Sequence, residues 1–189
     1  QAGGLTRVRK ARDEQREQLA STVKKLKTHS PEFVSVTFGA GGSTLSYTPE
    51  TVRELRQTHG LNGVPHLSCM GGSREEISNL LQLYKALGCD RLVALRGDMP
   101  TGMARSGDFR FAADLVHFIR EEHGDHFRIE VAAYPEMHPE AQSLEKDVEY
   151  ARRKVESGAS FLVTQLFFEN EKYFEYVKNA ALGVPVVPG

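Results

Sequence analysis

Polar side chains stand at the ends of several apolar runs, where the strands of a parallel sheet would bring them together. Arg96 and Asp98 follow the apolar residues 92–95, and Gln165 lies in the apolar run 161–168. In parallel α/β proteins the active site forms at the carboxyl ends of the strands. An arginine there can bind an anion, and a fixed aspartate can stabilise developing positive charge beside a reacting centre. The spacing predicts a ligand site, unless Arg96 and Asp98 simply form an ion pair with each other.

Two polar side chains are predicted to lie inside apolar strands. A buried amide costs free energy unless it is satisfied, so Gln165 predicts a ligand with matching hydrogen-bond donors and acceptors. His66 follows Val64 and Pro65, and such a histidine is either a hydrogen-bonded core residue or part of a binding site.

A glycine-rich turn at residues 39–42 offers a third candidate feature. It could bind phosphate, but it lacks the third glycine of a dinucleotide fingerprint and could equally be a flexible loop. Taken alone, this turn suggests a barrel enzyme acting on a phosphorylated small molecule. That hypothesis leaves Gln165 unexplained.

Charged residues also cluster after the fourth apolar run. Glu136 and Glu140 flank His138, but the spacing is not that of a helical zinc motif and two prolines interrupt the segment, so no metal site is predicted. Asp147 and Lys154 are seven residues apart, which places them on one edge of a helix. They form either a surface ion pair or part of the site.

Six short β-branched and aliphatic runs predict buried strands. They are Phe33–Phe38, Val64–Cys69, Arg91–Leu95, Arg128–Tyr134, Phe161–Phe168 and Val184–Val187. Apolar residues at helical spacing lie between them, with a helix cap predicted at Thr48 before Pro49 and a capping box at Ser73 and Glu76. The glycines expected to end helices are Gly60, Gly88, Gly124 and Gly158. The alternation predicts a parallel sheet covered by helices on each side.

This alternation fits either an open doubly wound sheet or a (β/α)8 barrel, and a closed barrel normally takes about 250 residues. The chain has 189 residues, too few for closure. The first helical pattern, near residues 13–28, has no apolar strand before it, and the last predicted strand ends at Pro188 and Gly189. We therefore expect one compact unit that is a portion of a longer chain, with a strand missing at its start and β/α units missing at its end.

Composition excludes several classes of protein. The chain is 40% hydrophobic and 26% charged, and its apolar runs are too short for a membrane span. Residues 1–29 hold eight Lys or Arg against three Asp or Glu, a net charge of +5, which leaves −6 for the rest of a chain of net charge −1. Such a basic arm could contact nucleic acid, but a short cationic terminus is more often a solvated end. We expect neither nucleic-acid nor membrane partners.

Cysteine usage indicates the compartment. Cys69 and Cys89 lie on different predicted elements, and the chain shows no signal-peptide pattern. This arrangement predicts reduced thiols in the cytoplasm rather than a secreted, disulfide-linked domain.

Five motifs, in order and spacing, resemble those of methylenetetrahydrofolate reductases. They are Ser35–Ala40, Pro65–Cys69, Ala94–Asp98, Ala132–Ala141 and Thr164–Phe168. The likeness runs from about Pro31 to Gly189 and includes the closing residues 184–189. It implies an FAD-containing (β/α)8 TIM barrel, incomplete here with about six β/α units and an aberrant first strand. Residues 1–30 would be a basic segment leading into the first helix, and residues 31–189 a partial FAD-binding catalytic domain.

The resemblance also implies an activity. A hydride would pass from NADH or NADPH to FAD and then to 5,10-methylenetetrahydrofolate, giving 5-methyltetrahydrofolate in a ping-pong sequence, and the full-length protein would be a homo-oligomer. Asp98 would tune the flavin and stabilise the cationic folate, Gln165 would contact whichever substrate stacks on the flavin, and Thr37 would lie near the nicotinamide. The residues implied to surround FAD are Phe38, Ala40, His66, Arg96, Gly97, Asp98, Ala112, Tyr134, His138, Ala141, Asp147, Arg153 and Lys154.

The chain departs from the family pattern at its start. The family has an aromatic-rich strand there with a glutamate that acts as general acid toward folate, whereas residues 5–12 are basic here. Losing a general acid commonly costs about 10²- to 10⁴-fold in rate. We therefore expect little activity from these residues alone, and the alternative to an active reductase is a non-catalytic module with partial flavin binding. Phe111 is a second departure, because some relatives have a tyrosine there.

Overall fold

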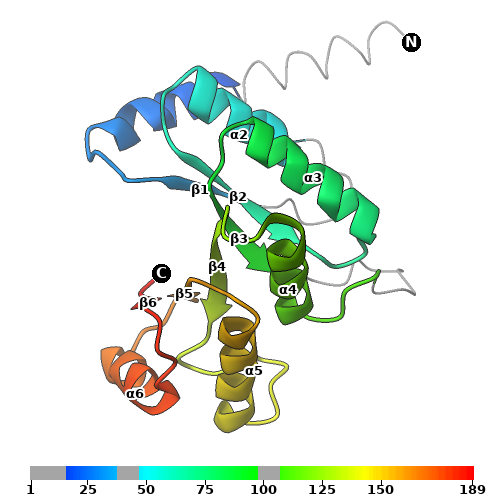
Figure 1. The fold of residues 1–189 in the computed structure, drawn as a ribbon. Helices are drawn as coiled ribbons and strands as arrows, with labels where there is room; N and C mark the ends of the chain where they lie inside the picture. Colours follow the sequence, from blue (N-terminus) through cyan, green and yellow to red (C-terminus); the bar gives the residue numbers. More distant parts are fainter. Residues whose placement is uncertain (1–15, 38–46, 98–106) are drawn as a thin grey trace, which may run out of the picture.

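The computed structural model describes residues 16–37, 47–97 and 107–189, and Figure 1 shows a curved sheet with helices along its convex side. The elements run β1 (Val34–Val36), α2 (Tyr47–Gln57), β2 (Gly63–Ser68), α3 (Arg74–Ala86), β3 (Arg91–Leu95), α4 (Ala112–His123), β4 (Arg128–Ala133), α5 (Leu144–Glu156), β5 (Phe161–Thr164), α6 (Asn170–Ala180) and β6 (Val186–Val187). A further helix, residues 16–27, precedes β1. The six predicted strands are confirmed, but β5 is shorter than predicted, since residues 165–168 lie beyond its end. The basic residues 5–12 and the glycine-rich residues 39–42 lie outside the described residues.

The strands form one sheet in the order β1-β2-β3-β4-β5-β6, and every neighbouring pair is parallel. A doubly wound sheet reverses its strand order at a switch point, and this sheet does not. The connection between two parallel strands is right-handed. When every new strand is added on the same side of the previous strand, all the connecting helices therefore lie on the same face of the sheet. The prediction of helices on each side is therefore wrong, and the arrangement is a curled part of a (β/α) barrel wall (Figure 1).

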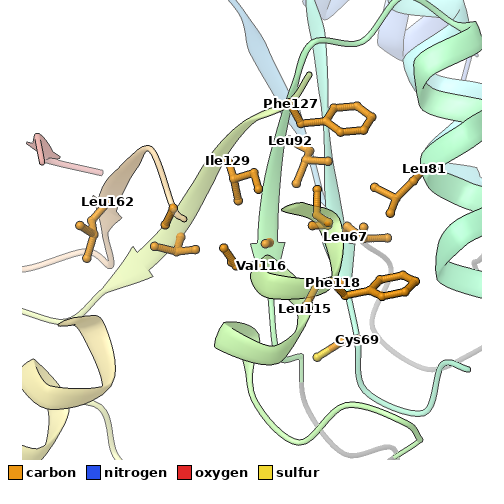
Figure 2. Close-up of a cluster of buried hydrophobic side chains, with 14 of the residues drawn as sticks. Leu67, Cys69, Leu81, Leu92, Leu115, Val116, Phe118, Phe127, Ile129 and Leu162 are labelled. Carbon is orange, nitrogen blue, oxygen red and sulfur yellow. The ribbon is translucent and has the colours of Figure 1, made fainter. Parts of the chain in front are cut away.

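The main hydrophobic core lies between the sheet and the helices (Figure 2). Leu92, Ile129 and Leu162 come from β3, β4 and β5, and they are fully buried in one cluster with Leu81 of α3 and Leu115 of α4. Full burial of a leucine-sized side chain contributes about 1.5–3 kcal/mol. This layer therefore fixes the positions of the strands whose ends carry the polar residues.

Both cysteines are free and buried in the same core. Burial raises the pKa of the Cys69 thiol to about 11 and also raises that of Cys89. A thiol that stays protonated is a poor nucleophile and metal ligand. The prediction of reduced thiols is confirmed, and both side chains act as small apolar core residues.

On the concave face, five residues near the amino-terminal ends of the strands form what we call the Arg91 cluster: Glu32, Phe33, Arg91, Glu130 and Phe161. Arg91 of β3 forms an ion pair with Glu130 of β4 and another with Glu32, whose Oε1 lies 3.1 Å from Nη1. The Arg91 guanidinium carbon lies 3.7 Å from the ring centroid of Phe33 and 4.8 Å from that of Phe161. Since Phe33 precedes β1 and Phe161 lies on β5, these contacts join distant strands and hold the curve of the sheet.

Helix ends follow the predicted local chemistry in part. The capping box of α3 is confirmed, because Ser73 Oγ accepts from the Glu76 N–H (3.2 Å) and the Glu76 carboxylate accepts from the Ser73 N–H (2.8 Å). The cap at Thr48 is wrong: α2 begins one residue earlier, and the Thr48 hydroxyl donates to the Thr37 carbonyl oxygen (3.2 Å). Gly124 ends α4 with φ +54°. Within the described ranges, no helix has the length and apolar character to cross a membrane.

Candidate functional site

The carboxyl-terminal ends of β3, β4 and β5 open into one pocket of about 800 Å³. The start of α4 and the part of α5 that carries Asp147 and Lys154 complete its wall. A volume of this size accommodates a large organic ligand. The pocket thus lies where parallel α/β enzymes have their active sites.

Most of the predicted site residues line this pocket, namely Arg96, Gly97, Ala112, Tyr134, His138, Ala141, Asp147, Arg153, Lys154 and Gln165. Thr37 and His66 are described but do not line it. His66 is partly buried on β2, where burial lowers the pKa of its imidazole and favours the neutral form. Phe38, Ala40 and Asp98 lie outside the described residues.

Hydrogen bonds from the continuation of β2 fix the turn after β3. The Ser68 hydroxyl and the Met70 N–H both donate to the Arg96 carbonyl oxygen, each at 2.9 Å. Gly97 has φ +81°, and a Cβ there would collide with the Ser68 side chain, so the turn requires glycine. The turn places Arg96 in the pocket wall, where its guanidinium pairs with the Glu140 carboxylate (Nη2–Oε2 2.6 Å).

Replacing Gly97 by alanine is expected to lower the free energy of unfolding by about 1–3 kcal/mol. The alanine would have to adopt a left-handed backbone angle and displace the Ser68 hydroxyl. Denaturant unfolding measures the loss. In a Ser68→Ala background the same change should cost less, because part of the collision is gone; equal costs in the two backgrounds would contradict this explanation of the turn.

Asp147 ties the segment after β4 to α5. Its carboxylate accepts a hydrogen bond from the His138 N–H (3.0 Å), and the residue is only 6% exposed. Burial raises the pKa of the Asp147 carboxyl, while the His138 hydrogen bond and the Lys154 charge oppose that rise. The His138 ring in turn meets the Tyr134 ring edge-on, with centroids 4.6 Å apart. Asp147 therefore holds one wall of the pocket in place.

Lys154 is a half-buried cation in the same wall. Its ammonium donates to the Ala132 carbonyl oxygen of β4 and forms no ion pair with any carboxylate in the part of the chain that the structure describes. Burial lowers the pKa of Lys154 to about 8, and the Asp147 charge partly offsets this effect. The predicted alternative of a surface ion pair between Asp147 and Lys154 is wrong. A cation that is partly withdrawn from water and has only a neutral carbonyl as its hydrogen-bond partner is stabilised by a nearby anion, so this wall is suited to an anionic ligand.

Gln165 lies one residue beyond the end of β5 and is exposed. Its backbone N–H donates to the Ala133 carbonyl oxygen (2.7 Å), and its side-chain oxygen accepts from the Leu166 N–H (3.1 Å). The interpretation of Gln165 as a buried amide is therefore wrong, because the strand ends before it. The residue still lines the pocket beside Leu166, so its contact with a bound ligand stays a prediction.

Two aromatic residues of the wall, Phe111 and Tyr150, were not among the predicted site residues. Their rings are nearly parallel, with an interplanar angle of 16°. Tyr150 precedes Arg153 by about one helical turn, and this spacing could have placed it on the same face of α5. Nothing in the sequence indicated that Phe111 faces it.

A sequence model of methylenetetrahydrofolate reductase matches residues 10–189. The chain belongs to the methylenetetrahydrofolate reductase family. It is 36% identical over 179 residues to the 5,10-methylenetetrahydrofolate reductase of Salmonella typhimurium and 38% identical over 176 residues to that of Pectobacterium carotovorum. These alignments cover 93% and 92% of this chain but only 59% and 58% of the two reductases. The chain thus spans less than two thirds of the length of these curated relatives.

Solved structures of other enzymes share the fold of this methylenetetrahydrofolate reductase family member. Its similarity to 2,3-dimethylmalate lyase has a TM-score of 0.59 at 8% identity, over 87% of this chain and 60% of that one. Its similarity to phosphonopyruvate hydrolase has a TM-score of 0.58 at 14% identity, over 74% of this chain and 49% of that one. At these identities the likeness supports the curled α/β fold alone.

The pocket fits the chemistry of FAD, the cofactor that the resemblance to methylenetetrahydrofolate reductases implies. The half-buried Lys154 together with Arg96 and Arg153 suits a diphosphate. The start of α4 also forms part of the wall, and a helix amino terminus favours negative charge. Tyr134 and Gln165 stand at the strand ends, where a planar ring with amide-like edges can bind.

Proposed function

We propose that the protein reduces 5,10-methylenetetrahydrofolate to 5-methyltetrahydrofolate, with FAD bound in the pocket and NADH or NADPH as hydride donor. Membership of the family supports the reaction. The observation that supports an anionic cofactor in this pocket is the half-buried Lys154, which lacks an ion-pair partner among the described residues. When bound, FAD accepts a hydride from the nicotinamide coenzyme and delivers it to the folate, so the two substrates react in ping-pong order.

In this proposal the α5 wall binds the charged part of the cofactor. Lys154 and Arg153 neutralise the diphosphate, and Arg96 adds a third positive charge from the turn after β3. Asp147 holds the His138 backbone and so keeps the wall closed on one side, and its own contact with the cofactor stays a prediction from the resemblance. The protein thereby orients the planar ring toward the strand ends.

The residues at the strand ends would act on the substrates. Gln165 at the mouth of the pocket would contact whichever substrate stacks on the flavin, and Thr37 would lie near the nicotinamide. Asp98 would place a fixed negative charge beside the cationic form of the folate, which stabilises positive charge as it develops. These roles come from the resemblance and are proposals for this chain.

Anaerobic stopped-flow spectroscopy of the flavin-loaded protein tests the proposal in two half-reactions. NADH or NADPH should bleach the flavin absorbance, and 5,10-methylenetetrahydrofolate should restore it while 5-methyltetrahydrofolate is formed. Flavin that neither coenzyme reduces would contradict the proposal. Reduction by the coenzyme without reoxidation by the folate would favour the alternative, a module that binds flavin but does not turn over folate.

A further inference from the structure

We propose that the Glu140 carboxylate is an internal counterion that a bound anion displaces from Arg96, so that Glu140 sets the affinity of the pocket for its anionic ligand. Glu140 lies in the segment after β4, Arg96 lies in the turn after β3, and both line the pocket. The inference rests on the proposed function, which gives the pocket a ligand with a diphosphate. It concerns a group that opposes the binding of that ligand.

The Glu140 carboxylate holds the position on Arg96 that an anion would take. One of its oxygens lies 2.6 Å from Arg96 Nη2. Carboxylates and phosphates accept the same charge-assisted hydrogen bonds from a guanidinium group, so the carboxylate acts here as a stand-in for a phosphate. Among the described residues, the other hydrogen bond of this guanidinium is a longer one, from Nε to the Gly97 carbonyl oxygen at 3.4 Å. An anion that binds Arg96 through Nη2 must therefore replace Glu140.

The exposure of Glu140 allows this replacement. Its side chain is 63% exposed, whereas the Arg96 side chain is 32% exposed. Ion pairs at such exposure contribute little to stability, so a multiply charged anion can displace the carboxylate. The Glu140 backbone N–H donates to His138 Nδ1 at 3.0 Å, which fixes the main chain at this point. The carboxylate can therefore turn into solvent while the main chain of the pocket wall stays in place.

The other cations of the wall are not masked in this way. Lys154 forms no ion pair with a described carboxylate, and Arg153 pairs with Glu149, which does not line the pocket. Among the described residues, Glu140 alone both lines the pocket and forms an ion pair with a cation of its wall. Removing the Glu140 charge should therefore free the positive charge of Arg96 for the ligand without altering another ion pair.

Calorimetric titration of the flavin-free protein with pyrophosphate, and separately with FAD, tests the inference. Glu140→Gln keeps an oxygen that can accept from Arg96 but removes the charge, so it should bind both ligands about two- to fivefold more tightly. In an Arg96→Gln background, Glu140→Gln should change neither affinity, because the counterion has no cation to mask. Glu175→Gln makes the same change in net charge at an exposed position of α6 outside the pocket, and it should leave both affinities unchanged.

The outcomes separate this inference from its rival and from the proposed function. If Glu140 instead orients Arg96 for the ligand, Glu140→Ala should weaken binding and Glu140→Gln should restore it, and that pattern would overturn the inference. Folate reduction through FAD, with an FAD affinity that Glu140→Gln leaves unchanged, would also overturn it while the proposed function stands. Pyrophosphate affinities with the expected pattern in a protein that binds no FAD would support the counterion and contradict the proposed function.

Discussion

Replacing Arg91 by leucine is expected to lower the free energy of unfolding by about 3–5 kcal/mol, the usual cost of removing one partner from a buried ion pair. Glu130 is 1% exposed and would lose the guanidinium that pairs with it. The contacts of the Arg91 guanidinium with the Phe33 and Phe161 rings would also be lost. These contacts join distant strands of the curved sheet, so its curvature would be less well fixed. Denaturant unfolding at pH 7 measures the difference.

The pH dependence of that loss follows from Glu130. Burial already raises the pKa of its carboxyl, and Arg91 opposes the rise. Without Arg91 the folded-state pKa moves further above the unfolded value, so the folded form favours protonated Glu130. That stabilisation is fully present below the unfolded pKa and is lost as the pH rises, so the stability deficit of Arg91→Leu should shrink on acidification.

Two further variants distinguish a buried ion pair from a general loss of packing. Arg91→Leu/Glu130→Leu should recover most of the loss, because no buried charge remains unpaired. Arg128→Leu should cost less than about 1 kcal/mol, since Arg128 also lies over the Phe161 ring, at 4.9 Å, but is exposed. A double variant as unstable as the single one would contradict the role assigned to the ion pair.

Replacing Lys154 by methionine is expected to weaken FAD binding by about 10- to 150-fold, the range for a lost hydrogen bond to a charged group. In the unaltered protein the affinity should also fall as the pH rises above about 8, where free Lys154 loses its proton. Above that pH, Lys154 must take up a proton when the anionic FAD binds. The FAD affinity should therefore fall by up to about tenfold per pH unit. Fluorescence titration of FAD between about pH 6.5 and 9.5 measures both effects.

The matched variants assign the pH dependence to one group. Lys154→Arg keeps the charge but does not titrate in this range, so it should bind FAD with a flat pH profile. Lys154→Met should also bind FAD with a flat pH profile, at a lower affinity. Arg96 and Arg153 do not contribute to the pH dependence of FAD affinity, since arginine stays protonated. An unchanged slope in Lys154→Met would mean that another group titrates, and the place given to Lys154 would be wrong.

The strands could be predicted from the sequence because each is a short run rich in β-branched and aliphatic residues. The alternation of strands and helices did not decide between a doubly wound sheet and a barrel wall, because both architectures share it. The resemblance to the family implied the barrel, and the strand order β1 to β6 agrees with it. The end of β5 was misplaced for a related reason. Leu166 and Phe168 are as apolar as a core strand, yet they are 63% and 84% exposed beyond Thr164.

Charged residues were the hardest to place. Arg91 and Glu130 stand on strands, where a charged residue normally indicates a solvent-exposed position. Both are buried, because Glu130 pairs with Arg91 and the Arg91 guanidinium lies against the rings of Phe33 and Phe161. Asp147 and Lys154 were at the spacing of a surface pair, but the packing of α5 against β4 buries Asp147 and leaves Lys154 half-buried, with no ion pair between them. Burial of charge depends on contacts between distant segments, which a local pattern does not contain.

A crystal structure of the protein with FAD tests most directly whether the pocket at the ends of β3, β4 and β5 is the flavin site. The expected density places the diphosphate against Lys154 and Arg153, with the isoalloxazine ring beside Tyr134 and Gln165. FAD found elsewhere on the protein, or an empty pocket at saturating FAD, would contradict the assignment of this pocket.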